Sequence, residues 1–154
     1  MADFHWPQSE AKYDVAVLRN VPVPMRDGVE LSADIYRPTL DSELAPGPFP
    51  AILIRTPYDK NVTLAGNEPE FWARRGYVQV VQDVRGRFNS GGEFYLLRDE
   101  GPDGYDTIEW VAEQRWCDGQ VGTMGTSYLA WVQSAAACLN PPHLSAMWVN
   151  QGAF

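Results

Sequence analysis

A serine set among small residues is the feature of this sequence best suited to covalent chemistry. The tetrapeptide Gly-Thr-Ser-Tyr at residues 125–128 follows a short apolar run, residues 121–124, and opens a second apolar segment. Where a strand passes directly into a helix, Ser127 would lie on a sharp turn with its hydroxyl pushed outward, the geometry of a nucleophile elbow. The GxSxG pattern of that elbow is incomplete, because Leu129 stands where the second glycine would be. By itself, the tetrapeptide is more often the start of an ordinary helix, with Ser127 or Thr126 as its N-cap.

The N-terminal part of the sequence predicts a β-hairpin. Apolar residues alternate loosely from Val15 to Met25 and strictly from Val29 to Ile35, and Asp27 with Gly28 supplies a turn that tolerates positive φ. Residues 1–14 have no such period, and we expect them to form an arm that lies on the surface.

Strands and helices then alternate, which predicts a three-layer α/β fold with a mostly parallel sheet. Short continuous apolar runs are typical of strands that are covered on both faces. The segment after Ser127 is apolar nearly all round, so we expect it to be a helix buried by other layers. We assign residues 15–154 to this one domain, with strands at 51–54, 77–84, 121–124 and 144–149, and helices at 68–75, from Pro102 to Trp116, and at 128–139.

The charge balance excludes several classes of partner. Twelve Lys and Arg against twenty Asp and Glu give a net charge of −8, which repels both nucleic acid and anionic membrane surfaces. No apolar run approaches the length of a membrane helix, and the first residues do not resemble a signal peptide. We therefore expect a cytoplasmic protein, with Cys117 and Cys138 as two buried free thiols.

Metal and nucleotide cofactors find no support in the motifs. Cys117, Cys138 and His143 lack the spacing of a zinc site. Residues 90–92 lack the lysine of a phosphate-binding loop, and residues 99–104 lack the ligands of a calcium loop. We expect neither a metal nor a cofactor.

Five segments, in order and spacing, give the chain a family resemblance over nearly all of its length. It resembles the start of the α/β-hydrolases that include cocaine esterase, the Xaa-Pro dipeptidyl-peptidases and the α-amino acid ester hydrolases. The segments are VPMRDGVELSADIYRP, RTPYDK, QDVRGRFNSGGEF, DGYDTIEWVAEQRWCDGQVG and GTSYLA. The family elbow is usually GxSYxG, and Ala130 replaces its final glycine, which affects only the tightness of helix packing there.

The resemblance implies an α/β-hydrolase fold and three catalytic groups. Ser127 would be the nucleophile that accepts the acyl group, and the backbone N–H of Tyr128 would donate to the oxyanion. Tyr58, in the PYD segment, would donate to the same oxyanion through its hydroxyl; without the resemblance it would be taken for a packed loop tyrosine. Asp83 and Arg85 are interpreted as a structural charge pair that shapes the following loop.

Two functions are compatible with these residues. The first is a serine hydrolase that cleaves ester or amide bonds through an acyl-enzyme; the second is a truncated or degenerate hydrolase domain without activity. Residues 119–154 contain no Asp, Glu, Lys or Arg, so no triad acid follows Ser127, and His5 and His143 are the only histidines. We therefore expect an N-terminal portion of a catalytic domain that is inactive by itself. A flavodoxin-like nucleotide binder is less suitable, because no phosphate loop follows residue 54.

The substrate class stays open at this stage. An ester, a Xaa-Pro peptide and the side-chain amide of a β-lactam are all compatible with the resemblance, as is an oligomer. The expected partner is a small-molecule ester, amide or short peptide.

Overall fold

The structure is a computed structural model that describes residues 9–62 and 68–152. One sheet runs through it in the strand order β1-β2-β5-β4-β6-β7, with the short β3 paired to β2. The strands are β1 (Asp14–Pro24), β2 (Glu30–Leu40), β3 (Glu43–Leu44), β4 (Phe49–Thr56), β5 (Val78–Asp83), β6 (Cys117–Thr126) and β7 (Leu144–Asn150). The helices are α1 (Pro69–Ala73), α2 (Glu100–Ala112) and α3 (Tyr128–Ala137).

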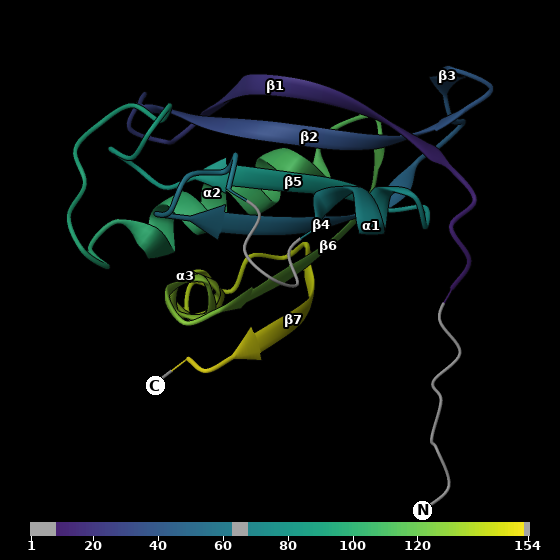
Figure 1. The fold of residues 1–154 in the computed structure, drawn as a ribbon. Coiled ribbons are helices and arrows are strands. Elements are labelled where there is room, and N and C mark those ends of the chain that lie inside the picture. The colour runs from purple at the N-terminus through teal and green to yellow at the C-terminus, as the bar shows by residue number, and fades with distance from the viewer. Residues whose placement is uncertain (1–8, 63–67, 153–154) are drawn as a thin grey trace, which may run out of the picture.

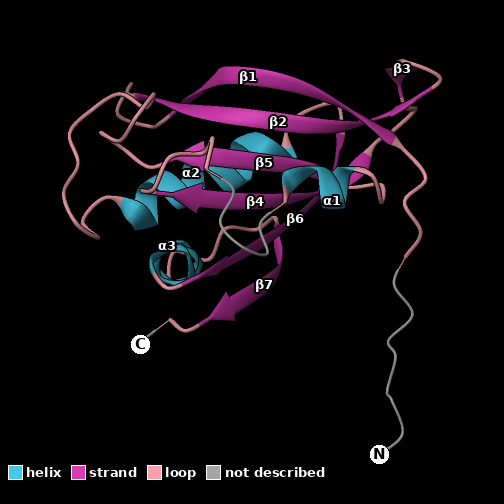
Figure 2. Cartoon of the chain, viewed as in Figure 1, coloured by secondary structure: helices cyan, strands magenta, loops and turns pink. Residues whose placement is uncertain are grey.

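The predicted three-layer α/β architecture is confirmed. β4, β5, β6 and β7 run parallel, and the hairpin of β1 and β2 adds two antiparallel pairings. Figure 1 shows α2 behind the sheet and α1 in front of it, and Figure 2 shows these helices separated by the magenta strands. Parallel strands covered in this way bring their carboxyl ends, and the loops that follow them, to one edge of the sheet.

Two apolar clusters, one on each face of the sheet, form the core. Leu53 and Val80 join the cluster beneath α2, whereas their neighbours Ile54 and Val81 join the cluster beside α1. Because side chains alternate along a strand, each continuous apolar run supplies both clusters. β5 is buried at every position, as its sequence predicts.

Some boundaries differ from those predicted. α2 begins at Glu100, two residues before Pro102. Proline is tolerated in the first turn of a helix because the N–H groups there have no acceptor within the helix. β6 is longer than residues 121–124. β3 has no counterpart among the predicted strands; it is joined to β2 through Asp41 and Ser42, at φ 50° and 67°, the geometry of a tight hairpin turn.

Two predictions of burial are wrong. α3 is not buried all round, since Trp131 is 38% exposed. Cys138 is exposed because it follows the last residue of α3, whereas Cys117 is buried as predicted, and both thiols are free. No helix in the described part of the chain has the length and apolarity to cross a membrane.

Candidate functional site

Ser127 lies between the carboxyl end of β6 and the first residue of α3, in a conformation that few L-residues adopt. Its φ is 61° and its ψ is −120°. Its N–H donates to the carbonyl of Asn150 (3.0 Å), and its own carbonyl accepts from the N–H of Ala130 (2.9 Å). An ordinary N-cap residue has extended backbone and bonds a helix N–H through its side chain. The Ser127 hydroxyl makes no such cap bond in the described chain, so the geometry favours the elbow over the simple helix cap.

Close packing on both sides of Ser127 explains the small residues around it. A Cβ atom at Gly125 would lie 2.3 Å from the Cβ of Leu129. Ala130, which replaces the usual final glycine, is fully buried against Gly152, where an added Cβ would meet the Ala130 Cβ at 2.7 Å. The glycine at 152 therefore makes the room that Ala130 needs.

The side chain of Tyr128 fixes the first turn of α3 to α2. Its hydroxyl donates to Oε1 of the buried Glu100 (2.7 Å) and accepts from the N–H of Leu97 (3.4 Å). Burial first, and then the bond to Glu100, raise the pKa of the Tyr128 phenol, so the group stays protonated and donates. Within the described residues, the N–H of Tyr128 donates to no backbone carbonyl, which leaves it available at the helix N-terminus.

Tyr58 reaches the same place from the loop after β4. Its ring meets the ring of Tyr128 edge to face, with centroids 6.4 Å apart and an angle of 70° between the planes. The side chain is 45% exposed, and its hydroxyl bonds to no group in residues 9–62 and 68–152. The structure thus brings together all three residues singled out in the sequence: Ser127 and Tyr128 are adjacent, and Tyr58 contacts Tyr128.

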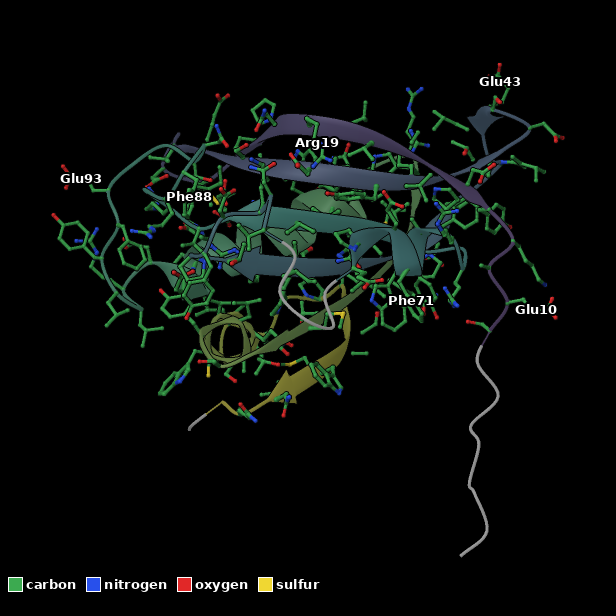
Figure 3. All side chains as sticks on the ribbon, in the orientation of Figure 1. Glu10, Arg19, Glu43, Phe71, Phe88 and Glu93 are labelled. Atoms are coloured by element: carbon green, nitrogen blue, oxygen red, sulfur yellow. The ribbon has the colours of Figure 1, made fainter. Side chains whose placement is uncertain are left out.

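The loop between β5 and α2 forms an aromatic wall beside these residues. Phe94 packs against Tyr128 with ring centroids 6.5 Å apart, and the guanidinium of Arg87 lies 5.2 Å from the ring centroids of both Phe88 and Phe94. Phe88 and Glu93 mark this loop in Figure 3, at the end of the sheet toward which β4 and β5 point. The side of Tyr128 that faces this loop is therefore bordered by the Phe94 ring, which the Arg87 guanidinium covers in turn.

A buried polar cluster lies beneath the elbow and was not predicted from the sequence. Arg55, 3% exposed, donates from Nε to Gln82 (2.8 Å) and from Nη1 to the carbonyl of Glu100 (3.0 Å). Arg55 Nη1 also lies 3.0 Å from Glu100 Oε2 in an ion pair. The signal in the sequence was the arginine itself, which directly follows the buried run 51–54.

The predicted pair of Asp83 and Arg85 is wrong. Arg85 instead donates to Asp103 (2.6 and 2.9 Å) and to Asp27 (2.8 Å), on the face of the sheet that α2 covers. Asp83 faces the other side and accepts from the N–H of Lys60 (2.8 Å). Strand alternation sends Gln82 toward α2 and therefore turns Asp83 away from it.

His143, the histidine of the described chain, does not supply a base to Ser127. The carbonyl of His143 accepts from the N–H of Val121, which places this histidine just before β7 and beside the middle of β6, and its Nδ1 lies 2.7 Å from Glu109. Val121 and Ser127 are six steps apart along the strand, a distance of about 20 Å at 3.3 Å per residue. His5 lies outside the described residues. The described residues also contain no cluster of His, Cys, Asp and Glu that could hold a metal ion.

Comparison with known proteins supports the resemblance found in the sequence. Residues 27–154 match the family model of the X-Pro dipeptidyl-peptidases (S15 family). The chain is 47% identical over 132 residues to cocaine esterase from Rhodococcus sp. (strain MB1 Bresler), which covers 83% of this chain and 22% of that protein.

Solved structures agree with this result. A CocE/NonD family hydrolase from Staphylococcus aureus superposes with a TM-score of 0.77 at 34% identity, covering 86% of this chain and 27% of the other. An α-amino acid ester hydrolase superposes with a TM-score of 0.77 at 28% identity, covering 100% of this chain and 28% of the other. The chain therefore spans roughly a quarter of these longer proteins. With this fold and a family model that covers residues 27–154, the chain belongs to the X-Pro dipeptidyl-peptidase (S15) family of α/β-hydrolases.

Proposed function

We propose that this chain carries the nucleophile and the oxyanion donors of a serine hydrolase that cleaves ester or amide bonds through an acyl-enzyme. The observation that carries the proposal is the backbone of Ser127, with φ 61° and ψ −120° between β6 and α3 and a hydroxyl that caps no helix. A strained turn of this kind aims a hydroxyl at a substrate rather than at the backbone.

In this mechanism, Ser127 Oγ attacks the substrate carbonyl and gives its proton to a base from outside the described residues. The negative charge of the resulting tetrahedral intermediate needs donors that are already in place. The N–H of Tyr128 and the hydroxyl of Tyr58 fill these roles, and the ring contact between the two tyrosines supports their acting on one oxyanion. The base then passes the proton to the leaving alcohol or amine, which departs and leaves the acyl group on Ser127. Water hydrolyses the acyl-enzyme in the second half of the reaction.

The substrate we propose is a small-molecule ester, amide or short peptide. The aromatic wall formed by Phe88 and Phe94 suits an apolar acyl or leaving group. Cocaine esterase and the α-amino acid ester hydrolase are relatives whose names refer to esters, which makes an ester the first substrate class to test.

The test of the nucleophile is covalent labelling by a fluorophosphonate probe. The protein should be studied as its gene encodes it, with any sequence that continues beyond Phe154. We expect labelling at Ser127 and its loss in Ser127→Ala, whereas Ser134→Ala, in the middle of α3, keeps the label. Labelling that survives Ser127→Ala would show that another residue is the nucleophile.

The test of Tyr58 is turnover of a p-nitrophenyl ester by Tyr58→Phe. Loss of one oxyanion donor typically costs about 10²- to 10³-fold in kcat, and we expect a loss of that size with the fold intact. A change of less than about threefold would reduce Tyr58 to a packing residue.

We further propose that residues 1–154 alone turn over no substrate, because no described histidine lies beside Ser127. A serine hydroxyl without a base stays protonated and weakly nucleophilic. The same ester assay on residues 1–154 tests this proposal, with Ser127→Ala as the control. Turnover that depends on Ser127 would require a base elsewhere in this chain.

A further inference from the structure

The loop that carries Tyr58 is fixed through its backbone on both sides of the tyrosine. The carbonyl of Pro57 accepts from Arg87 Nε (3.1 Å), and the N–H of Tyr58 donates to Thr56 Oγ1 (3.0 Å). Two residues beyond Tyr58, the N–H of Lys60 donates to Asp83 Oδ1 (2.8 Å). Since the Tyr58 hydroxyl bonds to nothing in the described chain, these backbone anchors and the ring contact with Tyr128 set its position.

Of these anchors, the carboxylate of Asp83 is the most deeply buried. Asp83 is fully buried at the end of β5, and a buried carboxylate needs a cation and hydrogen bonds to stay charged. The ammonium of Lys60, itself inaccessible to solvent, lies 3.3 Å from Asp83 Oδ2 and donates to Asn89 Oδ1 (3.0 Å). Asp34 lies 3.8 Å from the same ammonium.

Asp34 has a cation of its own, because Arg19 donates to it at 2.5 Å. Because Arg19 pairs with Asp34, Lys60 is available as the counter-ion of Asp83. Lys60 thus supplies both a backbone N–H and an ammonium to this carboxylate, whose Oδ2 also accepts from the N–H of Asn89 (3.3 Å).

The backbone bend at Asp59 links the position of Tyr58 to the hydrogen bond made by the N–H of Lys60. Asp59 has a φ of 79°, and its Oδ1 accepts from the N–H (3.0 Å) and from the side-chain amide (2.7 Å) of Asn61. A non-glycine residue in this region costs about 1–3 kcal/mol, so the bend persists only while its surroundings enforce it. Without the bond at Lys60, the loop can relax, and Tyr58 moves with it.

We propose that Asp83, with Lys60 as its counter-ion, is a positioning residue that presents Tyr58 to the oxyanion. This inference rests on the role proposed above for Tyr58. Asp83 touches no substrate; it acts by holding the amide of residue 60. A misplacement of about 1 Å in such a donor can cost 10²-fold in rate, so the anchor matters to kcat more than to substrate binding.

Two double variants separate the anchor from the charge. Lys60→Met/Asp83→Asn removes both charges but keeps an oxygen that can accept from the amide of residue 60. Lys60→Met/Asp83→Leu removes both charges and that acceptor with a side chain of similar size. Neither leaves an unpaired charge at these positions, and replacement of a buried ion pair by neutral residues is often tolerated. Arg26→Met, which removes the exposed ion pair with Asp106, is the control for the loss of an ion pair elsewhere.

We expect the leucine variant to lower kcat for p-nitrophenyl acetate by at least about tenfold, with KM within about twofold. The asparagine variant should recover most of this loss, and Arg26→Met should match the wild type. In a Tyr58→Phe background the leucine variant should lower kcat by less than about twofold more, because its effect passes through Tyr58. Amide exchange at residue 60 should be slow in the wild type and fast only in the leucine variants.

Four results would overturn the inference. The first is a leucine variant that is as active as the wild type while Tyr58→Phe is impaired, which leaves the role of Tyr58 intact. The second is a loss that adds in full to that of Tyr58→Phe, and the third is an amide of residue 60 that stays protected in the leucine variant. If Tyr58→Phe is itself fully active, the proposed role of Tyr58 and this inference fail together, while the labelling of Ser127 decides separately on the nucleophile.

Discussion

Two glycines of β6, Gly125 and Gly122, test whether the turn at Ser127 requires small residues. A Cβ at Gly125 would meet the Leu129 Cβ at 2.3 Å and the backbone C and O of Leu129 at 3.1 Å. A Cβ at Gly122, three residues earlier in β6, would meet only two carbonyl oxygens at 3.8 Å, an ordinary contact. The two alanine substitutions therefore make the same chemical change in β6 but differ in the space available.

The magnitude follows from the overlap at Gly125. Ordinary contact begins at 3.4 Å, so the first turn of α3 has to move by 3.4 − 2.3 = 1.1 Å. Overpacking of this kind costs about 1–3 kcal/mol, whereas replacement of a strand glycine by alanine in open space gains about 0.5–1 kcal/mol. We expect Gly125→Ala to be less stable than Gly122→Ala by about 2 kcal/mol or more in urea unfolding. The same shift moves the N–H of Tyr128, so fluorophosphonate labelling of Ser127 should slow by about 10²-fold.

Gly122→Ala should be labelled at the wild-type rate. The reasoning is refuted if the two variants unfold at the same urea concentration and are labelled equally fast. That result would mean that the turn before α3 has room for a side chain, and that the small residues at the elbow have another cause.

Other features of the structure make further predictions. Under native conditions Ellman's reagent should react rapidly with one thiol, that of Cys138, and slowly with Cys117, whose pKa is raised by burial; Cys138→Ser should abolish the rapid phase. Arg55→Met strips a buried carboxylate on α2 of its cation and should lower the unfolding free energy by about 3–5 kcal/mol, measured with urea. The hydrogen bond from Arg85 lowers the pKa of Asp27 in the folded state, so its contribution is present above the unfolded value of 3.8 and is lost as the pH falls through the folded value. The wild type should therefore lose more stability between pH 5 and pH 2 than Asp27→Asn.

The sequence predicted the parts of the fold that depend on local pattern. Three local patterns each correspond to an observed element: the alternation from Val29 to Ile35, the continuous run at 51–54 and the glycine-bounded turn at Asp27. They could be predicted because the period of apolar residues indicates a strand. The position of Ser127 between a strand and a helix followed in the same way.

Partners that are distant in the chain could not be predicted in this way. Arg85 and Asp83 are two residues apart, yet the end of β5 sends them to opposite faces of the sheet, where each finds a partner from another element. The anchoring of Tyr128 by Glu100 joins positions 28 residues apart and has no periodic signal. The exposure of Cys138 depends on the residue at which α3 ends, and helix ends are set by capping more than by period.

The contact between Ala130 and Gly152 makes these two positions share one methyl-sized volume, so that substitutions at them are coupled. Gly152→Ala alone would force two Cβ atoms to 2.7 Å, and Ala130→Gly alone would leave a void beside the elbow. The double exchange returns one methyl group to the same space and should be more stable than the sum of the single changes predicts. We therefore expect the residue at the final elbow position to depend on the residue that follows β7 at position 152, so that the two positions should covary among related sequences.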